Sequence, residues 1–445
     1  MEPINAISPV DGRYSAVTSP LKQFFSEKAL MKYRVEVEIE YFVALCRLGL
    51  PQLEGALENE EAIWSISLNF SDEDAAAIKD IEAITAHDVK AVEYFIKEKF
   101  EELGLGAFKE FVHFGLTSQD INNTAYPLML KGALEEGRYL GLLHEIINQL
   151  GDMSDQWREV PMLARTHGQP ASPTTLGKEM AVFAARLDEQ VAQLESLPYP
   201  AKFGGATGGL NAHKAAYPDV DWESFADNFV SSLGLLRSKP TTQIDHYDNL
   251  AAIFDCLRRI NIVLLDLCRD MWSYISMGYF HLKVKEGETG SSAMPHKVNP
   301  IDFENAEGNL GLANALLTFF SLKLPVSRLQ RDLSDSTVLR NIGMPLAYGL
   351  IAIKSVQKGL DKLIVNLPAL EKDLDENWEV IAEGIQTILR REGYPQPYEA
   401  LKELTRTGSH TGREMLDNFI DELDVPESVK HELRALSPRT YLGYC

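Results

Sequence analysis

Residues 250–282 read LAAIFDCLRRINIVLLDLCRDMWSYISMGYFHL and form the longest apolar region of the chain. One set of apolar residues recurs every three or four positions, as on one face of an α-helix: Ile253, Leu257, Ile260, Leu264, Leu267 and Met271. Further apolar residues lie around the rest of the helix, which is typical of a helix buried among several others. The region carries too many charges for a membrane span, namely Asp255, Arg258, Arg259, Asp266, Arg269 and Asp270. It therefore predicts a long helix inside a bundle.

The sequence on both sides of this region repeats the pattern. Long helices are predicted within 306–323 and 337–366, and a further amphipathic stripe consists of Leu140, Leu143, Ile147 and Leu150. Glycines and prolines fall between these runs, and alternating β-branched stretches are few. The glycine group at 204–209 lacks the lysine and hydroxyl ending of a phosphate loop, so it predicts a tight turn. A bundle of long helices is the expected centre of the protein.

Shorter helices are expected before and after this bundle. The helical pattern of residues 21–107 breaks after Leu48 and again near Ser71, which resembles a capping box with Asp74. The tail predicts short helices near 378–391 and 397–406. We therefore predict an all-α fold in three domains, with an N-terminal helical domain, a central helical bundle and a small C-terminal helical domain at 1–107, 108–360 and 361–445.

Composition narrows the classes of function. Across 445 residues, 43 Lys and Arg oppose 65 Asp and Glu, a net charge of -22 that argues against nucleic acid or anionic membranes as general partners. An anionic small substrate would need a local cluster of basic residues. The four cysteines have no CxxC spacing, and none of the ten histidines has metal-site spacing. The N-terminus lacks the features of a signal peptide, so we expect a cytoplasmic protein.

Three polar clusters interrupt the helical sequence: 114–123 (FGLTSQDINN), 165–173 (RTHGQPASP) and 290–300 (GSSAMPHKVNP). The first contains a common helix N-cap pattern. The second brings an arginine, a histidine and a glutamine together at an expected helix boundary, where His167 can donate a proton near neutral pH. The third is a polar loop that leads into a helix start at Ile301, where backbone N–H groups can receive an anion. Taken singly, each cluster is also compatible with an ordinary cap or surface loop.

Together the clusters resemble the signature regions of the fumarase/aspartase superfamily, helical lyases that eliminate fumarate from succinyl substrates. Residues 290–299 fit every fixed position of its most specific motif, GSSxMPxKxN. Further segments resemble the adenylosuccinate lyase family in its bacterial form: 8–14 (SPVDGRY), 85–88 (TAHD), 166–170 (THGQP), 301–305 (IDFEN) and 331–340 (RDLSDSTVLR). The resemblance extends from about residue 8 to 443.

The resemblance implies a fold, an assembly and an activity. Four long-helix bundles would form a homotetramer, and each active site would take its three signature regions from three different subunits. The implied reactions, both in purine synthesis, are cleavage of adenylosuccinate to AMP and fumarate and the matching cleavage of the succinylated imidazole-carboxamide ribotide. No metal or organic cofactor is implied.

The resemblance also assigns roles to residues. Ser291 would be the general base and His167 the general acid that protonates the leaving nitrogen. A serine is a poor base unless its alkoxide is stabilised by backbone N–H groups at a helix start and by a nearby cation, which Lys297 could supply. Physical reasoning alone does not choose between Ser291 and Ser292, which would otherwise bind substrate or shape the loop. His87 could alternatively hold His167 in its working tautomer.

The substrate would carry one phosphate and two carboxylates. The residues implied around the nucleotide are Arg13, Tyr14, Arg331, Ser336 and Arg340, the arginines being suited to bidentate contacts with oxyanions. Those implied near the succinyl carboxylates are Thr117, Ser118, Lys297 and Asn299. Those implied elsewhere in the pocket are His87, Asp88, Gln243 and Asn305. Ala86 stands where bacterial relatives often have asparagine, so any contact there would run through the backbone or be lost.

Two alternatives remain at this point. Another lyase of the superfamily, such as argininosuccinate lyase or fumarase, is the nearest, although Arg13, Arg331 and Arg340 favour a substrate with a phosphate. The other is a non-catalytic structural protein on the lyase scaffold, comparable to the lens crystallins derived from argininosuccinate lyase. The intact Ser291, Lys297 and His167 argue against it.

Overall fold

A computed structural model describes residues 2–284, 298–405 and 412–444 of the chain. The chain forms two compact units. Unit 1 contains Met1–Leu143, Gln190–Ile262 and Gly308–Ile353, and unit 2 contains His144–Glu189, Val263–Glu307 and Lys354–Cys445. The division into three domains stays a prediction. None of the described helices combines the length and apolar character that a membrane crossing requires.

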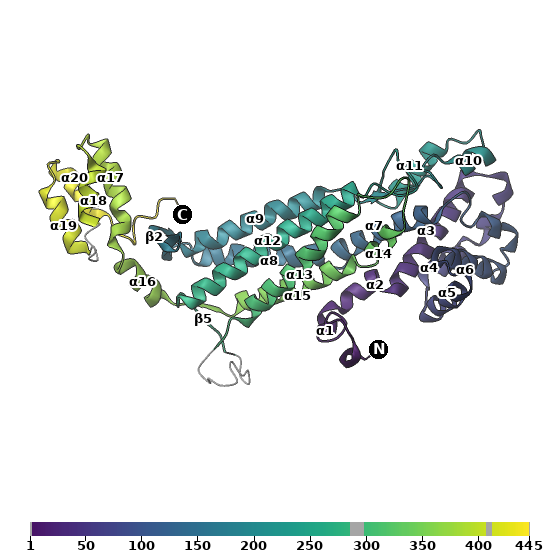
Figure 1. Cartoon of the computed structure of the whole chain (residues 1–445), viewed down its shortest axis with the longest axis horizontal. Helices are drawn as coiled ribbons and strands as arrows, with labels where there is room; N and C mark the ends of the chain where they lie inside the picture. Colours follow the sequence, from purple (N-terminus) through teal and green to yellow (C-terminus); the bar gives the residue numbers. More distant parts are fainter. Residues whose placement is uncertain (1, 285–297, 406–411, 445) are drawn as a thin grey trace. The chain divides into compact units, whose positions relative to one another are not determined.

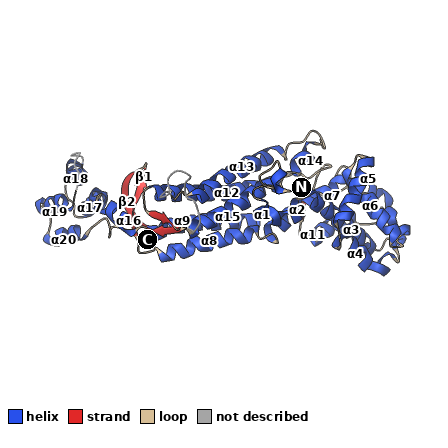
Figure 2. Ribbon diagram, turned by 90° about the horizontal axis from the view of Figure 1, so that it is seen from below, coloured by secondary structure: helices blue, strands red, loops and turns tan. Residues whose placement is uncertain are grey.

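Five long helices, labelled in Figure 1, each contain residues of both units. They are α8 (Tyr139–Gln156), α9 (Leu176–Ser196), α12 (Asp248–Ser276), α13 (Ile301–Lys323) and α15 (Gly343–Asp361). Side-chain hydrogen bonds join them: in unit 1, Asn261 of α12 donates to Asn314 of α13 at 3.1 Å. In unit 2, Ser355 of α15 donates to Asn305 of α13 at 2.8 Å. The predicted long helix is therefore α12, and the all-α class with a long-helix bundle is confirmed (Figure 2).

The remaining helices of unit 1 lie entirely within that unit. They are α1 (Ser15–Thr18), α2 (Lys22–Phe25), α3 (Glu27–Leu48), α4 (Glu60–Leu68), α5 (Asp72–Thr85), α6 (Asp88–Glu102), α7 (Ser118–Glu135), α10 (Asn211–Ala216), α11 (Trp222–Ser232) and α14 (Ser334–Leu339). Short 3-10 turns occur at Pro3–Asn5, Ser19–Leu21, Pro51–Leu53, Ala56–Asn59 and Gly106–Phe111. Strands β3 (Pro200–Ala201) and β4 (Leu236–Arg237) pair in parallel. The predicted capping box is confirmed, because Ser71 and Asp74 cap α5 reciprocally.

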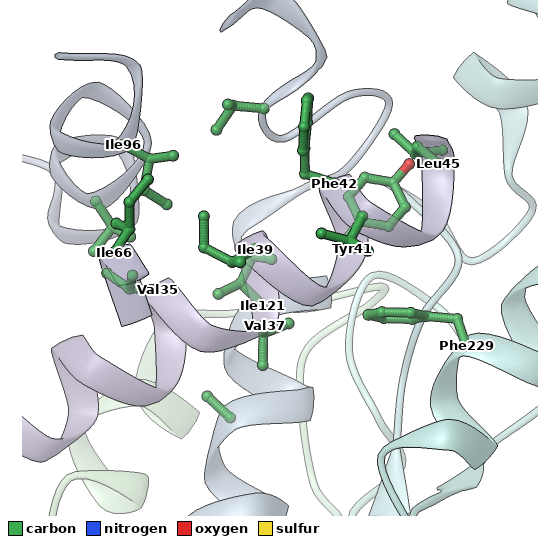
Figure 3. Close-up of a cluster of buried hydrophobic side chains, with 14 of the residues drawn as sticks. Val35, Val37, Ile39, Tyr41, Phe42, Leu45, Ile66, Ile96, Ile121 and Phe229 are labelled. Carbon is green, nitrogen blue, oxygen red and sulfur yellow. The ribbon is translucent and has the colours of Figure 1, made fainter. Parts of the chain in front are cut away.

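The core of unit 1 surrounds α3, which is buried on most of its surface (Figure 3). Val35, Ile39 and Tyr41 of α3 are fully buried. Phe42 meets Phe100 of α6 edge to face, with ring centroids 4.8 Å apart. Burying one such large side chain contributes roughly 1.5–3 kcal/mol, so this core fixes α3, α6 and α7 relative to one another.

Unit 2 contains two antiparallel strand pairs and a group of short helices. The strands are β1 (Pro161–Thr166) with β2 (Gln169–Thr175), and β5 (Phe280–Leu282) with β6 (Leu363–Val365). The helices are α16 (Leu367–Asp375), α17 (Ala382–Arg391), α18 (Pro397–Thr405), α19 (Arg413–Glu422) and α20 (Glu427–Ala435), with a 3-10 turn at Trp378–Ile381. They bury a separate core that includes Ile385, Leu389 and Leu433. The short helices predicted near 378–391 and 397–406 are confirmed.

The 165–173 cluster differs from its expected place at a helix boundary. It lies on the β1–β2 hairpin, and His167 and Gly168 form the two-residue turn between Thr166 and Gln169. Both turn residues have positive φ, 54° and 75°, as this class of hairpin turn requires. The helical interpretation was wrong because His167 and Gly168 adopt the positive φ values of a hairpin turn, which the surrounding helical pattern does not indicate.

Candidate active site

A cavity of about 640 Å³ lies in unit 1, and we call it the α6–α7 cavity. Its walls come from the end of α5, the starts of α6 and α7, and the segment 331–341. Seven residues singled out in the sequence line it: Ala86, His87, Asp88, Ser118, Arg331, Ser336 and Arg340. Segments more than 200 residues apart in the chain thus converge on one site.

The start of α6 places His87 in a defined orientation. Ala86 ends α5 in the left-handed conformation, with φ 52°, and so reverses the chain ahead of His87. The Nδ1 atom of His87 accepts the backbone N–H of Lys90 at 3.1 Å and caps α6. Because Nδ1 is an acceptor, the hydrogen of a neutral ring resides on Nε2. That Nε2 atom lies 3.5 Å from Ser118 Oγ.

The start of α7 presents Thr117 and Ser118. Thr117 is the N-cap residue, and Ser118 is the first residue of the helix. Backbone N–H groups at a helix start attract anions, and this start opens into the α6–α7 cavity. The carboxylate of Asp120 accepts the Thr117 N–H at 2.8 Å and holds the cap in place. Ser118 lines the cavity, whereas Thr117 does not, so a substrate carboxylate can meet the Ser118 hydroxyl and the backbone of this helix start here.

A chain of alternating charges forms one wall of the cavity. Arg34 is buried and donates from Nη2 to Asp88 at 2.7 Å. Arg340 donates to the same Asp88 oxygen at 2.8 Å and to Glu27 at 3.0 Å. Burial alone raises the pKa of Asp88, but Arg34 and the Val89 N–H outweigh it and hold the pKa below its usual value. Asp88 therefore fixes both arginines and is poorly suited to act as a proton donor.

Of Arg34, Arg331 and Arg340, Arg331 makes the longest hydrogen bonds. It approaches Gln243 Oε1 and Ser336 Oγ at 3.4 Å each, and Asp335 Oδ1 at 4.0 Å. Its buried Nε has no hydrogen-bond partner among the described residues. A guanidinium with long contacts and an unmatched donor is suited to receive an oxyanion. This arrangement also brings Gln243 to the cavity wall, although it is not a lining residue.

The other predicted site residues lie outside this cavity. Arg13 is exposed and Tyr14 half-buried, with the guanidinium carbon 6.0 Å from the ring centroid. His167 is exposed at its hairpin turn in unit 2, which also contains Asn299 and Asn305. Ser291, Ser292 and Lys297 lie outside the described residues. The roles assigned to all these residues stay predictions.

Sequence reasoning missed several residues that build the cavity. Arg34 and Asn122 form a buried hydrogen bond at 2.9 Å behind Asp88, and the overlooked lining residues are Glu82, Gln119, Asn122, Leu333, Thr337 and Asn341. Arg34 lies on a buried face of α3, where a charged residue is rare unless it is paired. Among the described residues no cluster of histidine, cysteine and carboxylate side chains is arranged to hold a metal ion.

Comparison with known proteins identifies the family. Residues 12–314 match the family model described as Lyase, and residues 327–442 match the model described as Adenylosuccinate lyase C-terminal. An adenylosuccinate lyase of Dictyostelium discoideum is 55% identical over 99% of this chain and 97% of that protein. Proteins of the same name from Escherichia coli K12 and Legionella pneumophila Corby are 50% and 52% identical over the same shares.

Solved structures agree on the fold. A fumarate lyase from Mesorhizobium sp. BNC1 has a TM-score of 0.74 at 20% identity, covering 96% of this chain and 95% of that chain. The 3-carboxy-cis,cis-muconate lactonizing enzyme from Pseudomonas putida has a TM-score of 0.72 at 21% identity, covering 95% and 93%. The resemblance found in the signature motifs is thereby confirmed, and the chain belongs to the adenylosuccinate lyase family of the fumarase/aspartase superfamily.

Proposed function

We propose that the protein eliminates fumarate from adenylosuccinate, which yields AMP, and from the succinylated imidazole-carboxamide ribotide. The substrate class is inferred from the α6–α7 cavity. There the buried Nε of Arg331 has no hydrogen-bond partner among the described residues, and Ser118 is the first residue of α7. The cavity therefore combines a cation for an oxyanion with a helix start for a carboxylate. Full-length similarity to adenylosuccinate lyases supports the same reaction.

The reaction needs one proton removed and another delivered. Ser291 takes the proton on the carbon next to the substrate carboxylate, and negative charge accumulates on that carboxylate. The C–N bond then breaks, the C=C bond of fumarate forms, and His167 protonates the leaving nitrogen. Thr117 and Ser118 stabilise the charged carboxylate through their hydroxyls and the start of α7, where such donors act without reorganisation.

The nucleotide part is assigned to the basic side of the cavity. Arg331 and Ser336 receive phosphate or ribose oxygens, and Arg340 is held ready by Asp88 and Glu27. Arg13 and Tyr14 of the N-terminal segment, with Lys297, Asn299 and Asn305, complete the binding set. Planar guanidinium groups suit this task because they bind oxyanions in a bidentate manner.

The active form is proposed to be a homotetramer with active sites shared between subunits. Leu312, Phe319 and Leu322 of α13 are 52%, 51% and 71% exposed, and their spacing places them on one helix face. An apolar helix face of this kind is typical of a contact with another chain. A second copy of this chain is the proposed occupant, because a shared site would unite the α6–α7 cavity with His167 and Ser291 of other subunits.

The direct test is an assay of purified protein with four substrates. Adenylosuccinate should give AMP and fumarate in equal amounts, and the succinylated imidazole-carboxamide ribotide should also release fumarate. Turnover of argininosuccinate or malate in place of these would reject the proposed substrate. Absence of any elimination would favour the non-catalytic scaffold.

A further inference from the structure

Behind the α6–α7 cavity, a fully buried ion pair lies at the first turn of α7. Lys202 Nζ is 2.7 Å from Asp120 Oδ1, and both side chains are 0% exposed. Asp120 is the third residue of α7, two positions after Ser118. Burial lowers the pKa of Lys202, whereas the carboxylate of Asp120 opposes that shift. A buried pair of this kind costs desolvation energy, so a core does not need it for stability alone.

The glycine turn at 204–209 completes the surroundings of Asp120. The N–H groups of Gly204 and Gly205 donate to Asp120 Oδ1 at 2.8 and 3.1 Å, and Lys202 also donates to Gly205 O at 2.5 Å. A Cβ on Gly204 would lie 2.8 Å from the carbonyl oxygen of Gly208, so the turn requires glycine there. The tight turn expected from the sequence is confirmed and serves as a receptor for one carboxylate.

The position of Asp120 creates an electrostatic conflict with the proposed substrate. Its carboxylate is well placed to hold the Thr117 cap, since an acidic group in the first helical turn is favourable. The same helix start, however, is assigned to a carboxylate of the substrate. A negative Asp120 without a counter-charge would repel that ligand through a poorly screened interior. Lys202 supplies the counter-charge from the side away from solvent.

We propose that Lys202 is a positioning residue that neutralises Asp120, so that the first turn of α7 keeps its cap and still attracts the substrate carboxylate. The inference rests on the proposed function, in that Thr117 and Ser118 bind the succinyl part. Lys202 acts through Asp120 and does not touch substrate. Its effect is specific for ligands bound at α7 and small for the nucleotide phosphate.

The test compares the inhibition constants of fumarate and AMP against adenylosuccinate turnover. Lys202→Met should weaken fumarate inhibition about tenfold, because an unpaired Asp120 charge then faces the site. Asp120→Asn should strengthen fumarate inhibition, because the unpaired lysine adds attraction. In Lys202→Met/Asp120→Asn fumarate inhibition should return to within about threefold of wild type, since no net charge remains. In Lys202→Met, AMP inhibition should change less than fumarate inhibition, because the phosphate is assigned to Arg331 and not to the start of α7.

A matched control removes another buried cation close by. Arg237 of β4 is only 4% exposed and pairs with Glu223 and Asp227 at 2.7 and 3.0 Å, neither of which belongs to α7. Arg237→Met should lower the melting temperature but leave the ratio of the fumarate and AMP constants unchanged. If Lys202→Met does not fold, the other two variants still test the proposal. Asp120→Asn should strengthen fumarate inhibition relative to wild type, and adding Lys202→Met to Asp120→Asn should weaken it again.

The outcomes separate the inference from the proposed function. The inhibition constant of fumarate could rise equally in Lys202→Met, Asp120→Asn and the double variant. That result would show that the pair has only a structural role and would overturn the proposal. So would an unchanged constant in Lys202→Met. Failure of the wild-type protein to release fumarate from adenylosuccinate would instead reject the proposed function.

Discussion

His87 Nε2 lies 3.5 Å from Ser118 Oγ, and both atoms belong to residues that line the same cavity. This separation is at the outer limit of a hydrogen bond, so the two groups hold each other only weakly. A ligand oxygen can therefore compete for both donors. The Lys90 N–H fixes the other ring nitrogen of His87, which keeps the Nε2 hydrogen directed away from the α6 cap.

His87→Asn should distinguish the role of His87 as the N-cap of α6 from its role as a hydrogen-bond donor in the cavity. Asparagine is a good N-cap, so the melting temperature should change by less than about 2 °C. The donor at Nε2 is lost, and kcat/KM should fall at least about tenfold, the value of one hydrogen bond to a charged ligand. Thermal unfolding and steady-state kinetics measure the two effects. His431→Asn, at an exposed position of α20, is the control, and an unchanged kcat/KM for His87→Asn would remove His87 from the site.

Ala86→Asn should stabilise the protein. Ala86 adopts φ 52°, a left-handed conformation that costs an alanine roughly 1–2 kcal/mol and an asparagine less. The free energy of unfolding should therefore rise by about 0.5–1 kcal/mol in urea titrations. Ala76→Asn, at an exposed right-handed position within α5, should instead lower it by about 0.5 kcal/mol. Destabilisation by Ala86→Asn would contradict the strain assigned to this residue.

Ala86 also shows what could be predicted from the sequence and what could not. The long helix α12 and the Ser71 cap follow from local patterns, because the periodicity and the capping residues lie in neighbouring positions of the sequence. The left-handed Ala86 and the His167 hairpin do not, since no asparagine–glycine pair marks either turn. Ala86 and His167 both have positive φ although neither is glycine, and their residue types do not indicate it.

Some residues of the candidate site could likewise be predicted from the sequence, and others could not. Ser118 and Arg331 were found because their motifs resemble a family, and the structure brings both to one cavity. Lys202 was overlooked, because its partner Asp120 lies 82 residues away and only the fold joins them. Burial of an ion pair is a tertiary property that no short motif encodes.

Stability should depend on pH through His113, the residue that precedes Phe114 in the first polar cluster. Its Nδ1 lies 2.6 Å from Oε1 of Glu38, whose side chain is 0% exposed. Burial lowers the pKa of His113, but Glu38 outweighs burial, assisted by Glu93 and Asp120, and the net shift raises it. A raised histidine pKa gives stability that is fully present below the unfolded value, about 6.5, and is lost as pH rises through the folded pKa.

His113→Asn should abolish this dependence. Asparagine tolerates the left-handed backbone at this position, where φ is 60°, so the main change is loss of the imidazolium. At pH 6 the variant should be less stable than wild type by about 3 kcal/mol, because Glu38 loses its partner. The difference should shrink as pH rises from 6 to 9 in urea unfolding. If the free energy of unfolding changes with pH in the same way for wild type and His113→Asn, the His113–Glu38 pair does not cause the pH dependence.

Subunit mixing should reveal whether active sites are shared. His167→Ala and Ser291→Ala should each abolish turnover while the protein stays folded and keeps the assembly state of the wild type. If each site takes these two residues from different subunits, equal mixing gives both intact residues in about one quarter of sites, and about a quarter of wild-type activity should return. Ser291→Ala mixed with Lys297→Ala is the matched control, because both residues belong to the GSSxMPxKxN motif, which one subunit would supply as a whole, so no hybrid site repairs both. Activity that stays absent after verified subunit exchange would place each site within a single chain.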